Sequence, residues 1–240
     1  MIKIINCTNK NYLKKLQSFL ELRRSRKNAE LKIVSNIIND IKKNGIKALL
    51  KYEKKFGKNN SIKSSREEIN KAVKKLNPKV KNAIDFSYNK ILNFHKKNLK
   101  SLKNISYTDK LKNKLEYKVV PIEKIGIYTP SGLPTSLLMT AIVARLAKVK
   151  KISVKSFPPP VFSNPAIMYV AKKTGIKSII NCGGAQAIAG LAYIKKVDKI
   201  VGPGNAWVAE AKRQLSGRII GTESMHAGES EICVIADNNT

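Results

Sequence analysis

Cysteine, histidine and tryptophan are scarce in this sequence, and their scarcity excludes several classes of protein. The 240 residues include three cysteines, two histidines and one tryptophan. The cysteines Cys7, Cys182 and Cys233 lie far apart and form no Cys-x-x-Cys pair. An odd number of widely spaced cysteines argues against a disulfide framework. We therefore expect a chain of a reduced, cytoplasmic compartment.

Long apolar runs are missing as well. No run of this sequence approaches the roughly 18 residues that a membrane-spanning helix needs. The first residues, MIKIINCTNKNYLKK, contain no continuous apolar segment followed by a small-residue cleavage site, so we identify no signal peptide. We expect no membrane partner.

Negative charge is the third feature in short supply. The chain has 16 acidic residues against 47 lysines and arginines, which gives a formal net charge of +31. A charge of this size is typical of proteins that bind nucleic acid. However, the lysines spread over the N-terminal half, and no basic run is interleaved with the aromatic residues that stack on bases. Lysine, asparagine and isoleucine are also the residues of A/T-rich codons, so we interpret the charge as compositional bias and keep nucleic-acid binding as the weaker alternative.

The first 120 residues are predicted to be mainly helical. Apolar residues share one face from Ala29 to Lys43, and Asn44-Gly45 is a helix stop signal. A second short helix is predicted over Ile46–Phe56, and Ser65-Arg66-Glu67-Glu68 forms a capping box before a third. The residues before Ala29 are basic and weakly patterned.

A longer helix is predicted to begin at Asn77-Pro78, which pairs an N-cap with proline at the first helical position. The apolar stripe predicted for this helix consists of Val80, Ile84, Tyr88, Ile91 and His95. A histidine on an apolar helical face is more often a hydrogen-bonded core residue than a ligand or a base, and we interpret His95 in this way. Leu115–Val120 predicts a strand that leads into the second half.

Composition changes near Pro121, after which lysine becomes less frequent and glycine and small apolar residues become more frequent. Strands are predicted at Ile125–Tyr128, Ile152–Lys155, Ser178–Ile180 and Lys199–Val201. Helices are predicted at Ser136–Lys148, from Asn164-Pro165 to a stop at Gly175, at Ala185–Tyr193 and at Ala206–Leu215. Alternating strands and helices imply right-handed crossovers and a parallel sheet. The predicted fold class is α/β, with an N-terminal helical segment over residues 1–120 and a Rossmann-like parallel-sheet domain over residues 121–230.

Two glycine-rich loops organise this second half. Cys182-Gly183-Gly184 follows one predicted strand and Gly202-Pro203-Gly204-Asn205 follows another, and each loop leads into a predicted helix. Glycine allows positive φ and a close approach of the backbone to a ligand, and helix N-termini favour anions. On the hypothesis that the two strands are neighbours, the loops form a crevice suited to an anion or a nucleotide.

Six residues lie at the carboxyl ends of the predicted strands, where ligands of such sheets bind: Tyr128, Gly183, Gly184, Gln186, Gly204 and Asn205. The usual dinucleotide fingerprint G-x-G-x-x-G is missing. Gly202-Pro203-Gly204 also fits simple turn chemistry, and Gln186 and Asn205 equally fit helix caps. Spacing alone supports a small-molecule-binding α/β domain.

Several longer segments resemble the histidinol dehydrogenase family. They are Gly126–Pro130, the Pro158-Pro159-Pro160 loop, Gly183–Ala189, Val197–Ala206, Glu210–Gln214, Ala227-Gly228, Ser230-Glu231 and Val234–Asp237. The resemblance covers most of the chain and is strong from Pro121 onward. Tyr52–Phe56 and Ile91–His95 resemble the family more weakly.

The resemblance implies an enzyme of histidine biosynthesis that oxidises L-histidinol to L-histidine in two NAD-dependent steps, with an essential zinc. Carried onto matching positions, it implies NAD contacts at Tyr128, Gln186 and Asn205 and a substrate contact at Ser230. The tyrosine would stack on a ring, and the amides would hydrogen-bond the cofactor. The resemblance also implies a homodimer.

The family's zinc ligands and catalytic Glu-His pair correspond to positions after Thr240, so no catalytic or metal-binding residue is assigned within this sequence, and residues 231–240 are interpreted as the first strand of a further domain. Departures from the family pattern are Ser131 and the segment Ser224–Glu231, which contains His226 and Glu229. We interpret His226 as a loop residue, because zinc needs three or four ligands. Two alternatives stay open beside an active enzyme: an inactive nucleotide-binding fragment, and one subunit of a split enzyme that pairs with a separate C-terminal half.

Overall fold

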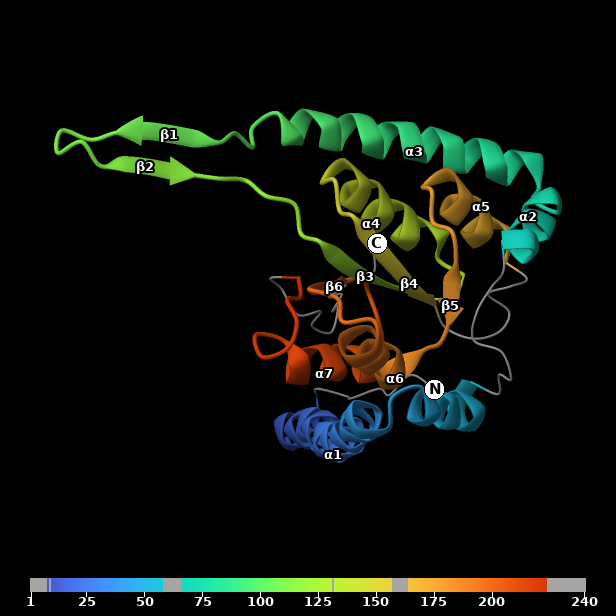
Figure 1. Ribbon diagram of the computed structural model, residues 1–240. Helices are drawn as coiled ribbons and strands as arrows, with labels where there is room; N and C mark the ends of the chain where they lie inside the picture. The colour runs from blue at the N-terminus through green and yellow to red at the C-terminus, as the bar shows by residue number, and fades with distance from the viewer. Residues whose placement is uncertain (1–7, 9, 58–65, 131, 157–163, 224–240) are drawn as a thin grey trace.

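A four-stranded parallel sheet forms the centre of the molecule. The computed structural model describes residue 8 and residues 10–57, 66–130, 132–156 and 164–223. The strands are β3 (Lys124–Thr129), β4 (Lys151–Ser156), β5 (Ile179–Asn181) and β6 (Lys199–Val201), in the order β5-β4-β3-β6 (Figure 1). All three pairings are parallel. The predicted α/β class and the four predicted strands of the second half are confirmed.

Helices cover both faces of this sheet in two further layers. The helices between the strands are α4 (Pro134–Leu146), α5 (Pro165–Lys173), α6 (Gly184–Ala189) with the π-helix η3 (Gly190–Ile194), and α7 (Ala206–Leu215). The N-terminal helices are α1 (Tyr12–Tyr52) with the π-helix η1 (Glu53–Gly57), α2 (Arg66–Lys74) and α3 (Pro78–Leu99). Figure 1 shows α2 and α3 over α4 and α5, and α1 on the opposite side against α6 and α7.

The helix α1 consists of two helical segments that meet at Gly45. Gly45 has φ 57° and ψ −129°, which breaks the helix at the predicted stop and favours glycine. The first segment begins at Tyr12, whereas we predicted a start near Ala29. The prediction was wrong because the residues before Ala29 are basic and carry no clear apolar period.

Asparagine caps begin two helices as predicted. The Asn77 side chain accepts a hydrogen bond of 2.8 Å from the Lys79 backbone N–H ahead of α3. The Asn164 side chain accepts from the Ala166 and Ile167 backbone N–H groups ahead of α5. In both cases proline follows the cap, where its missing N–H costs no hydrogen bond.

The apolar stripe predicted for α3 is only partly buried. Ile84 is 7% exposed, but Val80 is 42% exposed. Val80 lies in the first turn, one turn ahead of the stretch that packs on α4 and α5. The His95 ring is half-buried and lies edge-on to Phe94, with ring centroids 5.2 Å apart.

A β-hairpin that leaves the body of the molecule replaces the single connecting strand that we predicted at Leu115–Val120. Its strands are β1 (Ile105–Thr108) and β2 (Lys114–Tyr117), which pair antiparallel. All eight strand residues are exposed. The hairpin projects beyond α3 in Figure 1. The hairpin was missed because its first strand buries no apolar side chains, so the sequence shows no apolar pattern that would indicate a strand there.

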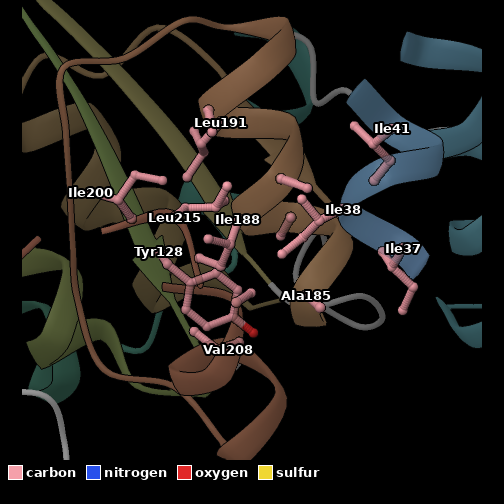
Figure 2. Packing of buried hydrophobic residues seen from close by; sticks show 14 of the residues in the cluster. Ile37, Ile38, Ile41, Tyr128, Ala185, Ile188, Leu191, Ile200, Val208 and Leu215 are labelled. Carbon is pink, nitrogen blue, oxygen red and sulfur yellow. The ribbon is translucent and has the colours of Figure 1, made fainter. Parts of the chain in front are cut away.

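Two hydrophobic clusters lie on opposite faces of the sheet. One joins α1, α6 and α7 and includes Ile41, Ile188 and Val208 (Figure 2). The other joins α2, α3, α4 and α5 and includes Ile127 and Ile167. The N-terminal helices therefore share their cores with the helices of the sheet.

The predicted domain boundary at residue 120 and the further domain predicted at residues 231–240 stay predictions. Residues 224–240 lie outside the part of the chain that the structure describes.

No helix within the described ranges is long and apolar enough to cross a membrane.

Candidate functional site

The two glycine loops follow strands at opposite edges of the sheet, so the predicted neighbouring strands were wrong. β5 and β6 are separated by β4 and β3. The helices that follow the two loops, α6 and α7, nevertheless both lie on the α1 side of the sheet and pack together (Figure 1). The chain runs outward from β3 to β5 and then returns to β6 beside β3. Ligands of open α/β sheets bind at such a reversal, outside the carboxyl ends of the strands.

Gly202 lies against the backbone of β3 at this reversal. Its φ is +114°, and a Cβ built on it would lie 1.9 Å from the Tyr128 carbonyl oxygen. A Cβ on Gly204 would lie 2.2 Å from Val208 Cγ1. Both positions require glycine. The loop is therefore a turn that also packs closely against the protein around it.

Tyr128, a predicted cofactor contact, is 3% exposed. Burial raises the pKa of its phenol to about 12. A hydrogen bond from the Gly184 backbone N–H to the phenol oxygen acts in the opposite direction and lowers this pKa. The ring lies in the cluster that contains Ile188 and Val208 (Figure 2). The hydroxyl thus links the end of β3 to the β5–α6 loop, and the covered ring does not fit the predicted stacking on a cofactor ring.

Asn205 is exposed and caps α7. Its side chain accepts a hydrogen bond of 3.2 Å from the Val208 backbone N–H. Of the two interpretations left open, the cap is confirmed. Contact with NAD stays a prediction for the side-chain amide, whose nitrogen is still able to donate.

Gln186 is 4% exposed and lies in the first turn of α6. Its Nε2 donates to Glu53 Oε1 at 2.9 Å, and the Gly183 backbone N–H donates to the same oxygen at 3.0 Å. Gln186 is therefore bound to Glu53, at the start of η1, rather than acting as a cap. Glu53 is fully buried and was missed by sequence reasoning, although it lies one helical turn after the buried Leu49 on the same face.

A buried lysine lies near this carboxylate. Lys155, on β4, is 1% exposed, and its Nζ lies 2.5 Å from the position of a Cβ on Gly190. Burial lowers the pKa of Lys155, while the nearby Cys182 and Glu53 oppose that change. Burial also raises the pKa of the Cys182 thiol, which disfavours the reactive thiolate.

Lys212, on α7, holds the second glycine loop in place. Its Nζ donates to the Gly202 carbonyl oxygen and, at 2.6 Å, to Glu223 Oε1. The hollow beside these groups has a cavity volume of about 20 Å³. A groove of about 720 Å³ lies between α1 and α7, away from these loops. The candidate site is therefore identified by its loops and side chains, and not by a large cavity.

Ser230, the predicted substrate contact, lies outside the described residues, as do His226, Glu229 and the Pro158-Pro159-Pro160 loop. Within residues 8–223, apart from the gaps in the description, no three His, Cys, Asp or Glu side chains gather to hold a metal. Zinc needs three or four ligands, so the described residues do not fit a zinc site.

These features define a class: an α/β protein with a doubly wound parallel sheet and a topological switch point between β3 and β6. Comparison with known proteins specifies the family. The histidinol dehydrogenase family model matches residues 21–240. The histidinol dehydrogenase of Pelagibacter ubique is 49% identical over 99% of this chain and 56% of its own length, and that of Campylobacter jejuni is 42% identical over 86% and 50%.

A crystal structure of histidinol dehydrogenase from Elizabethkingia anophelis superposes with a TM-score of 0.74 at 35% identity, covering 82% of this chain and 47% of the other. The chain belongs to the histidinol dehydrogenase family, whose name denotes oxidoreductases acting on histidinol. It spans about half the length of the curated relatives that it matches.

Proposed function

We propose that this chain is the NAD-binding half of a histidinol dehydrogenase, which oxidises L-histidinol to L-histidine. The observation that carries the proposal is the convergence of both glycine loops on Tyr128 at the switch point of the sheet. NAD, when bound, accepts hydride from the substrate. The chain's own residues bind and orient it: Gln186 and Asn205 supply amides, and Gly202 and Gly204 let the second loop pack closely on Tyr128 and Val208.

Tyr128 receives a different role from the stacking that the resemblance implied. Its ring is buried, and its hydroxyl and carbonyl contact the two glycine loops. We propose that Tyr128 does not contact the cofactor ring and instead supports the two glycine loops that form the cofactor site. Substrate contact at Ser230 stays part of the proposal by resemblance.

Catalysis is proposed to need the half of the family length that this chain does not span. The described residues offer no zinc site, so no step is assigned to a metal here. We propose a homodimer as the assembly, by resemblance. The cytoplasmic location stays an expectation from cysteine content.

The first test is NAD binding by the purified chain, measured by isothermal titration calorimetry. We expect wild-type binding that Gln186→Leu and Asn205→Ala each weaken by about tenfold, which corresponds to about 1.4 kcal/mol. Gln17→Leu, at an exposed position of α1, makes a comparable change away from the site and should leave affinity unchanged. Wild-type chain that binds no NAD would refute the proposal.

The second test is turnover. NADH formation from L-histidinol, NAD and zinc is assayed with the chain alone and with a separately expressed C-terminal half of a relative. We expect activity only with both halves. Activity of the chain alone that a chelator abolishes would overturn the assignment of zinc to the other half, and Glu223, His226 and Glu229 would be the first residues to mutate.

A further inference from the structure

Glu53 lies far from the predicted site in sequence but beneath it in space. The break at Gly45 separates the long first segment of α1 from a short second one, and Glu53 follows that segment at the start of η1. The side chain is fully buried and contacts residues that follow it by 130 and 133 positions. The start of η1 therefore supplies a polar group to the β5–α6 loop.

The two bonds to Glu53 determine which atom of the Gln186 amide faces which way. Glu53 Oε1 accepts from both the Gly183 backbone N–H and the Gln186 side chain. Because this oxygen acts as an acceptor in both bonds, the atom of Gln186 that faces it is the amide nitrogen. The amide oxygen lies toward Gly184, 2.9 Å from the position of a Cβ there. Gly184 therefore leaves space for that oxygen.

We infer that Glu53 is a positioning residue of the cofactor site, which holds the Gln186 amide so that its oxygen accepts a hydrogen bond from the cofactor. The inference rests on the proposed NAD site. The ligand group that Gln186 meets is then a donor, such as a carboxamide N–H, an amino N–H or a ribose hydroxyl. A Gln186 amide that is free to rotate presents its nitrogen and its oxygen to the cofactor equally. Such an amide loses conformational freedom when the cofactor binds, which weakens the affinity.

Lys155 governs how the inference is tested. Its ammonium group is buried near Glu53. Removing one of two opposite charges that are buried near each other leaves the other less compensated and destabilises the fold. The substitutions of Glu53 are therefore made in a Lys155→Met background, where neither charge remains.

The decisive comparison is Glu53→Gln against Glu53→Met in that background. Glutamine keeps an acceptor oxygen at the same reach, and methionine has the same length without one. In that background we expect Glu53→Gln to bind NAD within about threefold of wild type, and Glu53→Met to bind about tenfold more weakly than Glu53→Gln. Equal affinities of the two variants would overturn the inference.

A double-mutant cycle separates positioning from general damage. Combined with Gln186→Leu, Glu53→Met should cause no further loss, because its effect passes through Gln186. Combined with Asn205→Ala, it should cause its full tenfold loss, because Asn205 shares no contact with Glu53 among the described residues. Equal losses in the two backgrounds would contradict positioning through Gln186.

Failure of the inference differs from failure of the proposed function. Wild-type chain without NAD binding refutes both, whereas wild-type binding with an uncoupled Glu53 refutes only the positioning role. Near-ultraviolet circular dichroism of Trp207, the single tryptophan, on α7, reports whether each variant folds. If Glu53→Met does not fold, Glu53→Asp is made instead, with Lys155 retained. Aspartate is one methylene shorter than glutamate, so its carboxylate lies further from the Gln186 amide. This variant should weaken NAD binding only when Gln186 is present.

Discussion

Gly202 and Gly217 share a positive φ but differ in what surrounds them. A Cβ on Gly202 would lie 1.9 Å from the Tyr128 carbonyl oxygen, whereas one on Gly217, at φ +71°, would meet nothing within 4 Å. We expect Gly217→Ala to lower the free energy of unfolding by about 1 kcal/mol, through strain alone. Gly202→Ala should lower it by about 3 kcal/mol or more, because the backbone must also move. Urea denaturation measures both, and equal losses would contradict the close packing at Gly202.

The buried Lys155 makes stability depend on pH in a defined direction. Burial lowers the folded-state pKa of Lys155 below its usual 10.5. Between the lowered value and 10.5, the unfolded chain holds a proton that the folded chain has released, so the free energy of unfolding rises with pH. The slope from this residue is at most about 1.4 kcal/mol per pH unit.

Lys155→Met removes this contribution and leaves the other titrating groups in place. We expect the stability of wild type relative to Lys155→Met to increase as the pH is raised toward 10.5. Chemical denaturation of both proteins across the alkaline range measures the difference. A difference that stays constant with pH would show that Lys155 keeps its ordinary pKa.

At the scale of elements, the β1–β2 hairpin is predicted to be energetically independent of the body. Every strand residue is exposed, and a two-stranded hairpin alone has marginal stability. Its two ends lie close, since the Val119 backbone N–H donates to Asn104 Oδ1 at 2.9 Å. Replacing Ile105–Tyr117 by a short glycine linker should change the free energy of unfolding by less than about 1 kcal/mol.

The control for this deletion is Ile84→Ala in α3, where the side chain is 7% exposed. This change should cost about 2–4 kcal/mol through the cavity that it leaves. Thermal and urea unfolding of both variants test the pair. A hairpin deletion as costly as Ile84→Ala would show that the hairpin packs on another surface in solution.

At the scale of the whole molecule, positive charge opposes the compact state. The chain has 47 basic against 16 acidic residues, and a net charge far from zero destabilises a fold by self-repulsion. Raising sodium chloride from roughly 0.01 M to 0.15 M shortens the Debye length from about 30 Å to about 8 Å. We therefore expect Tm to rise over this range. A Tm that falls would indicate that attractive ion pairs, such as Lys173–Asp85 at 2.7 Å, outweigh the repulsion.

Much of the fold was predictable because its signals are local. The asparagine-proline pairs at Asn77 and Asn164 specify helix starts within a few residues of chain, and Gly45 specifies a break in the same way. The predicted limits of β6 and α7 match the structure, since each is bounded by turn or cap residues. Histidinol dehydrogenase family membership was also recognisable in the sequence, because its motifs are long.

The sequence by itself determined the strands of the parallel sheet, the helices that follow them, the asparagine-proline helix starts and the break at Gly45, since these depend on neighbours within one or two turns of chain. Only the tertiary structure decided that β5 and β6 lie at opposite edges of the sheet, that Tyr128 is buried, and that Glu53 binds Gln186. Each of these depends on which surfaces meet when α1, α6 and α7 pack together. Contacts between residues more than a hundred positions apart leave no local pattern, because they arise from the burial of apolar faces and carry the polar side chains into place.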